Sequence, residues 1–201
     1  MAKIGIMGGT FDPVHFGHLR AAEEVLQGFN LERVIFVPSG NPPHKAGERV
    51  SSAEHRYLMT VLATMDHPDF EVSRIEIDRP GFSYTLDTLK EFKKRFPEDR
   101  LYFITGADAI LSVHTWNGFK ELFELADFIA VTRPGYSMES LGCLRSLVGE
   151  SCFSRIHAFT VTSLAISSSD IRERVRKSLS IRYLIPEMVR RYIERNGLYR
   201  D

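Results

Sequence analysis

The stretch Lys3–Leu26, KIGIMGGTFDPVHFGHLRAAEEVL, decides the fold of this chain. A short apolar run ends at a pair of glycines, Gly8 and Gly9, and a helical pattern begins soon afterwards. A buried strand, a glycine turn and a helix in this order are typical of a phosphate site. Two histidines, His15 and His18, stand where the helix should begin. The stretch therefore predicts a phosphate-binding turn that carries two imidazoles.

Neither of the two common phosphate-loop patterns fits this turn. A Walker loop needs Gly-x4-Gly-Lys-Ser/Thr, but Pro13 stands five residues after Gly8, and the stretch contains no Gly-x-Gly-x-x-Gly. What remains is two glycines, the hydroxyl of Thr10, the rigid Pro13 and then His-x-Gly-His. The glycines, Gly17 included, would let the backbone approach a ligand closely, and the first amides of the helix would attract an anion.

The spacing of the histidines supports three interpretations. As N–H donors, both imidazoles could contact one phosphate and stabilise charge that builds up on it during transfer. Two histidines three residues apart can also bind a metal, for which Asp12 is the nearby carboxylate, although a prolyl bond follows it. They could equally be half-exposed surface residues. The spacing alone leaves the three open.

Strands and helices alternate along the rest of the chain. The apolar runs predict strands at Lys3–Met7, Arg33–Val37, Phe70–Ile75, Leu101–Thr105, Phe128–Val131 and Ser154–Phe159, with Val161. The helical spacings predict helices at Gly17–Phe29, Ser52–Met65, Thr85–Phe96, Phe119–Ala126, Met138–Val148, Ser168–Lys177 and Pro186–Asn196. We expect one α/β domain over residues 1–201, with a doubly wound parallel sheet covered by helices on both faces.

Ligands of such folds bind beyond the carboxyl ends of the strands, where the strand order reverses. The polar and glycine-rich residues of this chain follow predicted strands, so they should collect at one rim. They are Gly8-Gly9, Pro38–Lys45, Gly106–Asp108 and Arg133–Gly135.

Composition excludes several classes of partner. Lys plus Arg equals Asp plus Glu, at 26 each, so we expect neither nucleic acid nor an anionic membrane as a partner. No apolar run approaches the roughly 20 residues of a membrane span, and the first residues enter a strand without a signal-peptide pattern. The cysteines, Cys143 and Cys152, have no metal or redox spacing. They predict reduced thiols in a cytoplasmic protein.

Two motifs carry a family resemblance. GGTFDPVHFGH resembles the signature of the nucleotidylyltransferase superfamily, and ISSSDIR, at Ile166–Arg172, resembles its second mark about 150 residues later. Between them, the chain is similar to the bacterial nicotinate mononucleotide adenylyltransferases at PPHK, SYTLDTL, GADAI, Trp116 and VTRPG. That family often has threonine where Ser169 stands, and the hydroxyl is kept.

The resemblance implies a Rossmann-like fold and a reaction. The phosphate of nicotinate mononucleotide would attack the α-phosphorus of ATP directly, giving nicotinate adenine dinucleotide and pyrophosphate without a covalent enzyme intermediate. Mg²⁺ carried by ATP would help neutralise the triphosphate. ATP and nicotinate mononucleotide are the expected partners. The oligomeric state stays open, with a homo-oligomer among the outcomes.

The resemblance also implies roles on the ATP side. His15, His18, Lys45 and Arg172 would be the catalytic residues. ATP would contact Gly8, Gly9, Thr10, Phe11, Gly17, Gly106, Asp108, Ile166, Ser167 and Ser168. Taken singly, Lys45 and Arg172 could be ordinary surface residues, and Asp108 could cap a helix.

On the acceptor side, the implied contacts are Asn41, Lys45, Tyr84, Thr85, Trp116 and Arg133. Trp116 could stack on the pyridine ring or serve as a core aromatic. Thr85 could begin a helix whose amides take the nicotinate carboxylate, or it could simply cap that helix. The Gly40–Gly47 loop is a candidate lid.

Three rivals remain. An adenylyltransferase that acts on phosphopantetheine would share both terminal motifs but not PPHK, SYTLDTL and the tryptophan together. A non-catalytic nucleotide sensor would be expected to lack His18 or Arg172, and both are present. A nucleic-acid-binding protein would have a basic surface, which the neutral charge balance disfavours.

Overall fold

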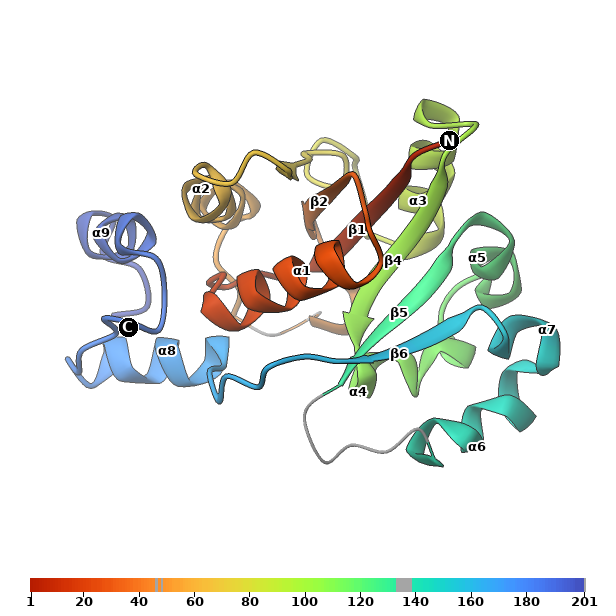
Figure 1. Cartoon of the computed structure of the whole chain (residues 1–201). Coiled ribbons are helices and arrows are strands. Elements are labelled where there is room, and N and C mark those ends of the chain that lie inside the picture. Colours follow the sequence, from red (N-terminus) through yellow and green to blue (C-terminus); the bar gives the residue numbers. More distant parts are fainter. Residues whose placement is uncertain (46, 48, 133–138, 201) are drawn as a thin grey trace.

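The computed structural model describes residues 1–45, 47, 49–132 and 139–200. At its centre lies a parallel sheet of six strands in the order β3-β2-β1-β4-β5-β6 (Figure 1). In chain order the strands are β1 (Lys3–Gly9), β2 (Arg33–Pro38), β3 (Phe70–Val72), β4 (Arg100–Gly106), β5 (Asp127–Thr132) and β6 (Ile156–Thr160).

Helices occupy most of the connections between the strands. The main ones are α1 (Phe16–Gly28), α2 (Ala53–Thr64), α3 (Thr85–Arg95), α5 (Phe119–Leu125), α6 (Glu139–Val148), α8 (Ser168–Arg176) and α9 (Glu187–Arg195). Short turns of helix add η1 (Pro43–Lys45), α4 (Ala107–Ile110), η2 (Val113–Thr115) and α7 (Glu150–Phe153).

The sheet separates two hydrophobic cores. Side chains alternate across each strand, so that in β4 Tyr102 and Ile104 join one core while Leu101 and Phe103 join the other. Residues of α1, α2, α8 and α9 complete the first core, and residues of α3, α5 and α6 complete the second. Strands buried on both faces are continuous apolar runs, which is how they stand in the sequence. The predicted doubly wound α/β fold is confirmed.

The strand order reverses between β1 and β4. From β1 the chain moves outward through β2 to β3, then returns to pair β4 with the free edge of β1 and continues to β5 and β6. Met7 lies beside Ile104 in the β1–β4 pair, so the two carboxyl ends meet at the same rim. The helices that follow them lie on opposite faces, which opens a crevice at this point.

Several predicted boundaries shift in the structure. The predicted strand at Phe70–Ile75 is wrong in length, because the chain turns after Val72 and Ile77 N–H bonds to Arg74 O at 2.8 Å. The last strand begins two residues later than predicted because α7 occupies the chain before it. The predicted stop at Asn196-Gly197 is confirmed, and Gly197 has a left-handed φ of 61°.

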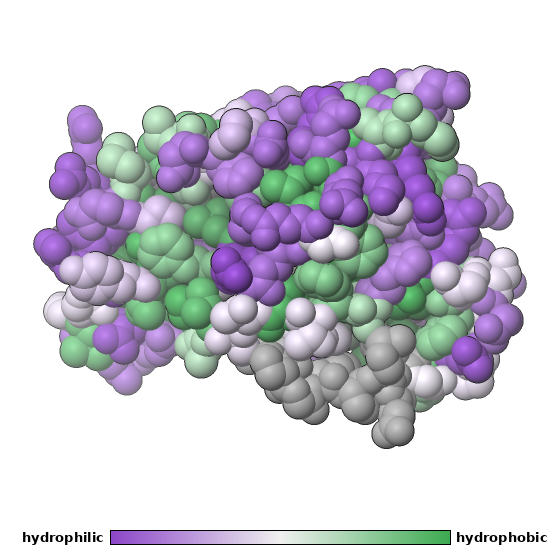
Figure 2. All heavy atoms as spheres, viewed as in Figure 1, coloured by the Kyte–Doolittle hydropathy of each residue, from purple (hydrophilic) through white to green (hydrophobic). Residues whose placement is uncertain are grey.

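The molecular surface mixes residue types. On the face in Figure 2, hydrophilic residues alternate with small apolar areas. Cys143 is exposed and Cys152 is half-buried, and no disulfide joins them. Within the described residues, every helix is too short or too polar to cross a membrane.

Candidate active site

The turn after β1 brings the two histidines together. His15 is the N-cap of α1 and His18 is its third residue, so the sequence-based placement of both is confirmed. Their rings stack with centroids 3.7 Å apart and planes inclined by 26°. Phe11 packs edge-on against His18 at 5.1 Å. The two imidazoles therefore present neighbouring nitrogen atoms at the start of a helix.

Hydrogen bonding fixes the protonation of His18. The backbone N–H of His15 donates to His18 Nδ1 at 3.2 Å, so Nδ1 carries the lone pair and Nε2 carries the proton. Burial, followed by the charge that His15 would carry, lowers the pKa of His18 well below its ordinary value. His18 is therefore a neutral N–H donor at physiological pH.

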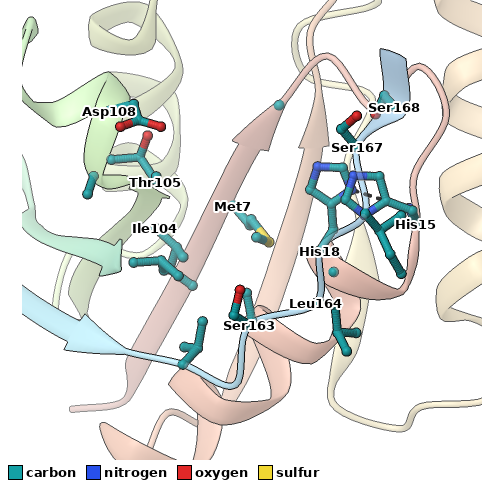
Figure 3. A pocket seen from close by; sticks show the side chains of 18 of the residues that line it. Met7, His15, His18, Ile104, Thr105, Asp108, Ser163, Leu164, Ser167 and Ser168 are labelled. Atoms are coloured by element: carbon teal, nitrogen blue, oxygen red, sulfur yellow. Dashed lines mark hydrogen bonds between the residues drawn. The ribbon is translucent and has the colours of Figure 1, made fainter. Parts of the chain in front are cut away.

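The histidines line a cavity of about 630 Å³ beyond the ends of β1, β4 and β5. In Figure 3 the stacked rings lie beside Ser167 and Ser168, while Asp108 and Thr105 lie on the opposite wall. We call this space the nucleotide cavity. It collects these residues predicted to bind ATP: Gly8, Gly9, Phe11, His15, Gly17, His18, Gly106, Asp108, Ile166, Ser167 and Ser168.

Four polar residues of the nucleotide cavity were not among the predicted site residues. They are Thr105, Thr132, Thr162 and Ser163. Each lies at or just beyond the carboxyl end of a strand, so their position could have identified them. They add hydroxyl and backbone partners suited to the ribose and base of a nucleotide.

Gly9 and Gly17 leave space for aromatic rings of neighbouring residues. A Cβ atom at Gly9 would lie 2.8 Å from the Phe11 ring, and one at Gly17 would lie 3.0 Å from the His15 ring. Both distances are shorter than ordinary van der Waals contact. Gly9 and Gly17 are therefore needed for packing inside the protein, in addition to the predicted close approach of the backbone to a ligand.

The serine motif forms the start of α8. Ser167 is the N-cap and accepts a hydrogen bond from Asp170 N–H at 3.1 Å. Ser168 Oγ donates to the carbonyl of Pro13 at 2.8 Å, which ties α8 to the histidine turn. These contacts bring two motifs that are 150 residues apart in sequence onto one cavity.

Arg172 points elsewhere. Its Nη1 donates to the backbone carbonyl of Asp12 at 2.7 Å, and it lines a neighbouring cavity of about 390 Å³. Arg49, Arg176 and Tyr199 line the same space, which we call the arginine cavity. Arg172 is thus adjacent to the nucleotide cavity rather than inside it.

A third cavity, of about 500 Å³, lies on the other side of β1 and β4. It shares Gly8, Gly9 and Thr105 with the nucleotide cavity, so the two spaces meet at the strand-order reversal. We call it the acceptor cavity. The predicted acceptor residues that line it are Tyr84, Thr85 and Trp116, and Thr10, which was predicted to contact ATP, lies here instead.

Trp116 belongs to the aromatic core and also has access to the acceptor cavity. It packs edge-on against Phe103 and Phe128, with ring centroids 6.1 and 6.4 Å away, and it also lines the acceptor cavity. Thr85 is the first residue of α3, and Tyr84 is the N-cap without a side-chain cap bond. The first backbone N–H groups of α3 therefore receive no hydrogen-bond acceptor from the Tyr84 side chain.

Glu76 is a buried carboxyl in the acceptor cavity that the sequence did not single out. Its Oε1 accepts a hydrogen bond from Thr88 Oγ1 at 2.7 Å. Burial raises the pKa of Glu76 despite that bond. The motif residue Ser83 lies beside it and accepts from the backbone N–H groups of Gly40 and Asn41, each at 3.1 Å.

Two of the described residues that were predicted to contact the acceptor, Lys45 and Asn41, do not line these cavities. Lys45 ends the short turn η1, and Asn41 lies in the loop before it. The Asn41 N–H donates to Ser83 Oγ at 3.1 Å, and the Ser83 N–H donates to Asn41 O at 2.9 Å. Their contact with the acceptor stays a prediction. Arg133 lies outside the described residues.

Arg56 was also missed, and it joins three loops of the site. Its side chain is 1% exposed. Nε donates to Ser51 O at 3.0 Å, Nη1 to Thr10 O at 2.8 Å and Nη2 to Gly40 O at 3.0 Å. In sequence, Arg56 falls on the same helical stripe as buried Met59, a charged residue on a core-facing position that could have identified it.

The described residues contain no group of three or more His, Cys, Asp or Glu side chains placed to hold a metal ion. Asp108 is the carboxylate that lines the nucleotide cavity.

Comparisons with known proteins identify the family of this chain. The cytidylyltransferase-like family matches residues 6–174. A protein of Thermoanaerobacter sp. named "Probable nicotinate-nucleotide adenylyltransferase" is 55% identical, covering 98% of this chain and 94% of its own. One of the same name from Moorella thermoacetica is 54% identical, covering 98% and 92%.

A solved structure shares the fold. The Plasmodium falciparum nicotinic acid mononucleotide adenylyltransferase complexed with NaAD matches with a TM-score of 0.78 and 20% identity, covering 99% of this chain and 98% of that one. The chain belongs to the cytidylyltransferase-like family and, within it, to the nicotinate-nucleotide adenylyltransferases.

Proposed function

We propose that this protein transfers the AMP moiety of ATP to nicotinate mononucleotide, releasing pyrophosphate and forming nicotinate adenine dinucleotide. The observation that carries the proposal is the meeting of the nucleotide and acceptor cavities at Gly8, Gly9 and Thr105, next to the stacked histidines. Two substrates bound in these cavities would bring their phosphates together at the shared wall. The names of the similar proteins support the same reaction.

The chemistry is a direct displacement. An oxygen of the mononucleotide phosphate forms a bond to the α-phosphorus of ATP while the bond from that phosphorus to the bridging oxygen of pyrophosphate breaks. The electron pair leaves with pyrophosphate, so no protein atom becomes covalently attached. The protein has to position the two phosphates and stabilise the charge on the oxygens between them.

The histidines meet this requirement as hydrogen-bond donors. His18 is neutral and carries its proton on Nε2, so this nitrogen can donate a hydrogen bond to a phosphate oxygen on which negative charge develops. The start of α1 adds backbone amides and the positive end of its dipole. We assign ATP to the nucleotide cavity, with its α-phosphate beside these rings.

Arg172 and Lys45 would act at the distal phosphates. Arg172 has its Nη1 on the carbonyl of Asp12 in the arginine cavity, adjacent to Ser168 and the histidine turn. We propose that the β- and γ-phosphates reach toward it. Lys45 would approach from the acceptor side with the Gly40–Gly47 loop. Mg²⁺ would arrive on the ATP phosphates and neutralise part of their charge.

The acceptor cavity suits a pyridine mononucleotide. Trp116 supplies an aromatic wall, and the amides at the start of α3 supply donors for the nicotinate carboxylate. The charged acid would gain more from such donors than the neutral amide of nicotinamide. We therefore propose that the acid is preferred.

The reaction is tested by pyrophosphate release from purified protein, Mg-ATP and one acceptor at a time. Nicotinate mononucleotide should support turnover, nicotinamide mononucleotide should be slower, and phosphopantetheine should be inert. Turnover with phosphopantetheine alone would overturn the assignment. A higher kcat/KM for the amide would overturn only the stated preference.

A further inference from the structure

Asp12 lies at the centre of contacts behind the histidine turn. It is 4% exposed, and its carboxylate Oδ2 accepts the backbone N–H of Ser51 at 3.2 Å. Its backbone carbonyl accepts Nη1 of Arg172 at 2.7 Å. Three residues further along the chain stands His15. A shift of Asp12 would therefore move both the catalytic turn and the anchor of Arg172.

The remaining carboxylate oxygen of Asp12 is held by the last part of the chain. Tyr199 Oη donates to Asp12 Oδ1 at 2.6 Å, across 187 residues of sequence. Burial and the adjacent carboxylate raise the pKa of Tyr199, so its hydroxyl stays protonated and remains a donor at neutral pH. Donation to a carboxylate makes this a charge-assisted bond.

The tail that carries Tyr199 is firmly attached. Tyr192 Oη lies 2.9 Å from His55 Nδ1, which joins α9 to α2, and Leu198 N–H donates to Ile193 O at 3.1 Å. Tyr199 itself has a left-handed φ of 64°, a conformation that is unfavourable for a residue with a Cβ atom. Such a conformation persists where surrounding contacts determine it. Figure 1 shows the C-terminus beside α8 and α9.

We propose that Tyr199 is a positioning residue for the nucleotidyl transfer, acting through Asp12 on Arg172 and on the histidine turn. The inference rests on the proposed function, because it assigns Arg172 to the ATP phosphates. The hydroxyl of Tyr199 fixes the Asp12 side chain, and the Asp12 peptide carries the carbonyl that orients Arg172. The end of the chain thereby helps to set the geometry of a site built mainly from its beginning.

The bond between Tyr199 and Asp12 matters because nucleotidyl transfer depends on the positions of the groups that hold the phosphates. Without the hydroxyl, Asp12 Oδ1 loses a charge-assisted donor in a buried place, and the peptide that holds Arg172 is less well fixed. Small misplacements of groups that orient a substrate reduce rates strongly. The acceptor cavity does not include Asp12, Arg172 or Tyr199, so acceptor binding should be little affected.

The test compares Tyr199→Phe with Tyr192→Phe in the full-length protein. Both variants remove one hydroxyl from the same C-terminal segment, but the Tyr192 hydroxyl contacts His55 and not the histidine turn. We expect Tyr199→Phe to lower kcat/KM for ATP about tenfold or more, with KM for nicotinate mononucleotide within about twofold. Tyr192→Phe should leave both parameters within about twofold, whatever it does to the melting temperature.

Equal kinetics of the two variants would overturn the inference and reduce Tyr199 to an anchor of the tail. Mg-ATP binding by calorimetry, without acceptor, gives a second readout, in which Tyr199→Phe should bind more weakly than Tyr192→Phe. If the wild-type protein releases no pyrophosphate with nicotinate mononucleotide, the proposed function fails, and the calorimetry still decides the role of Tyr199. Unchanged Mg-ATP affinity would then reject it.

Should Tyr199→Phe fail to fold, Asp12→Ala takes its place. Alanine has no side-chain oxygen to receive the Tyr199 hydroxyl, whereas asparagine would still offer its amide carbonyl. The same loss in kcat/KM for ATP is expected. Wild-type kinetics in that variant would overturn the inference, since the bond would then have no bearing on the site.

Discussion

At the scale of single residues, the site depends on the state of one ring. His18 accepts the N–H of His15 at Nδ1, which leaves its Nε2 proton available to a phosphate oxygen. The sequence identified both histidines from their position at a helix start. It could not identify the tautomer or the lowered pKa, because these depend on burial and on the ring stacked at 3.7 Å.

Replacement of His18 by Ala should therefore act on the chemical step. We expect kcat to fall about 10²–10³-fold, as for loss of one transition-state donor, with a much smaller change in the Kd of Mg-ATP. Single-turnover kinetics and calorimetry measure the two quantities. His67→Ala, which alters an imidazole outside the nucleotide and acceptor cavities, is the matched control.

A different kinetic result for His18→Ala would contradict the catalytic role of this ring. If kcat/KM and ATP affinity fall by the same factor, the ring holds ATP equally in the ground and transition states, and its assignment as a catalytic donor is wrong. The lowered pKa adds a pH expectation. Protonation of His18 should not limit kcat between pH 6.5 and 8, because the ring is already neutral there.

At the scale of elements, Arg56 of α2 joins the loops after β1 and β2 to the segment before α2. Its three hydrogen bonds all go to backbone carbonyls, so the contact is insensitive to the side chains of those loops. Burial lowers the pKa of Arg56, and the nearby carboxylate of Asp12 opposes that effect. The arginine remains charged and can orient all three carbonyls.

Loss of the three Arg56 hydrogen bonds should lower the stability of the protein. Arg56→Met leaves three carbonyls without their donor, and we expect the free energy of unfolding to fall by about 3 kcal/mol or more. Urea unfolding measures it. Arg155→Met, on an exposed side chain, should change stability by less than about 0.5 kcal/mol. A loss below about 1 kcal/mol for Arg56→Met would show that water replaces the guanidinium at those carbonyls.

The element scale also shows where sequence patterns stop being informative. The alternation of apolar runs and helical stripes was sufficient for the layers of the sheet, because strands buried on both faces must be continuously apolar. Boundaries shifted where local turns competed, as after Val72 and before Ile156. A helix cap such as Ser167 was predictable because its partner, Asp170 N–H, lies three residues away.

At the scale of the whole molecule, the strand-order reversal gathers motifs from both ends of the chain. The position of most candidates after a strand was enough to predict that they lie at one rim of the sheet. It could not divide them between cavities: Thr10 lies on the acceptor side, and Arg172 faces a cavity of its own. Glu76 was missed because its burial arises from packing between loops that are distant in sequence.

The proposed role of Mg²⁺ predicts that pyrophosphate release depends on the metal. Chelation with EDTA should abolish this release, and added Mg²⁺ should restore it, because we propose that the ion arrives bound to ATP. The melting temperature of the protein without ATP should not change, since the described residues form no three-ligand metal site. A drop in melting temperature with EDTA alone would instead reveal a resident structural ion.

The nucleotide and acceptor cavities share three small residues, Gly8, Gly9 and Thr105, and otherwise have separate walls. The nucleotide wall comes from the histidine turn and the serine motif, and the acceptor wall comes from Ser39, Glu76, Tyr84, Trp116 and their neighbours. The architecture is thus modular. Mutation and selection can remodel the acceptor wall while the ATP-handling half stays intact, which gives one catalytic scaffold a route to new acceptors.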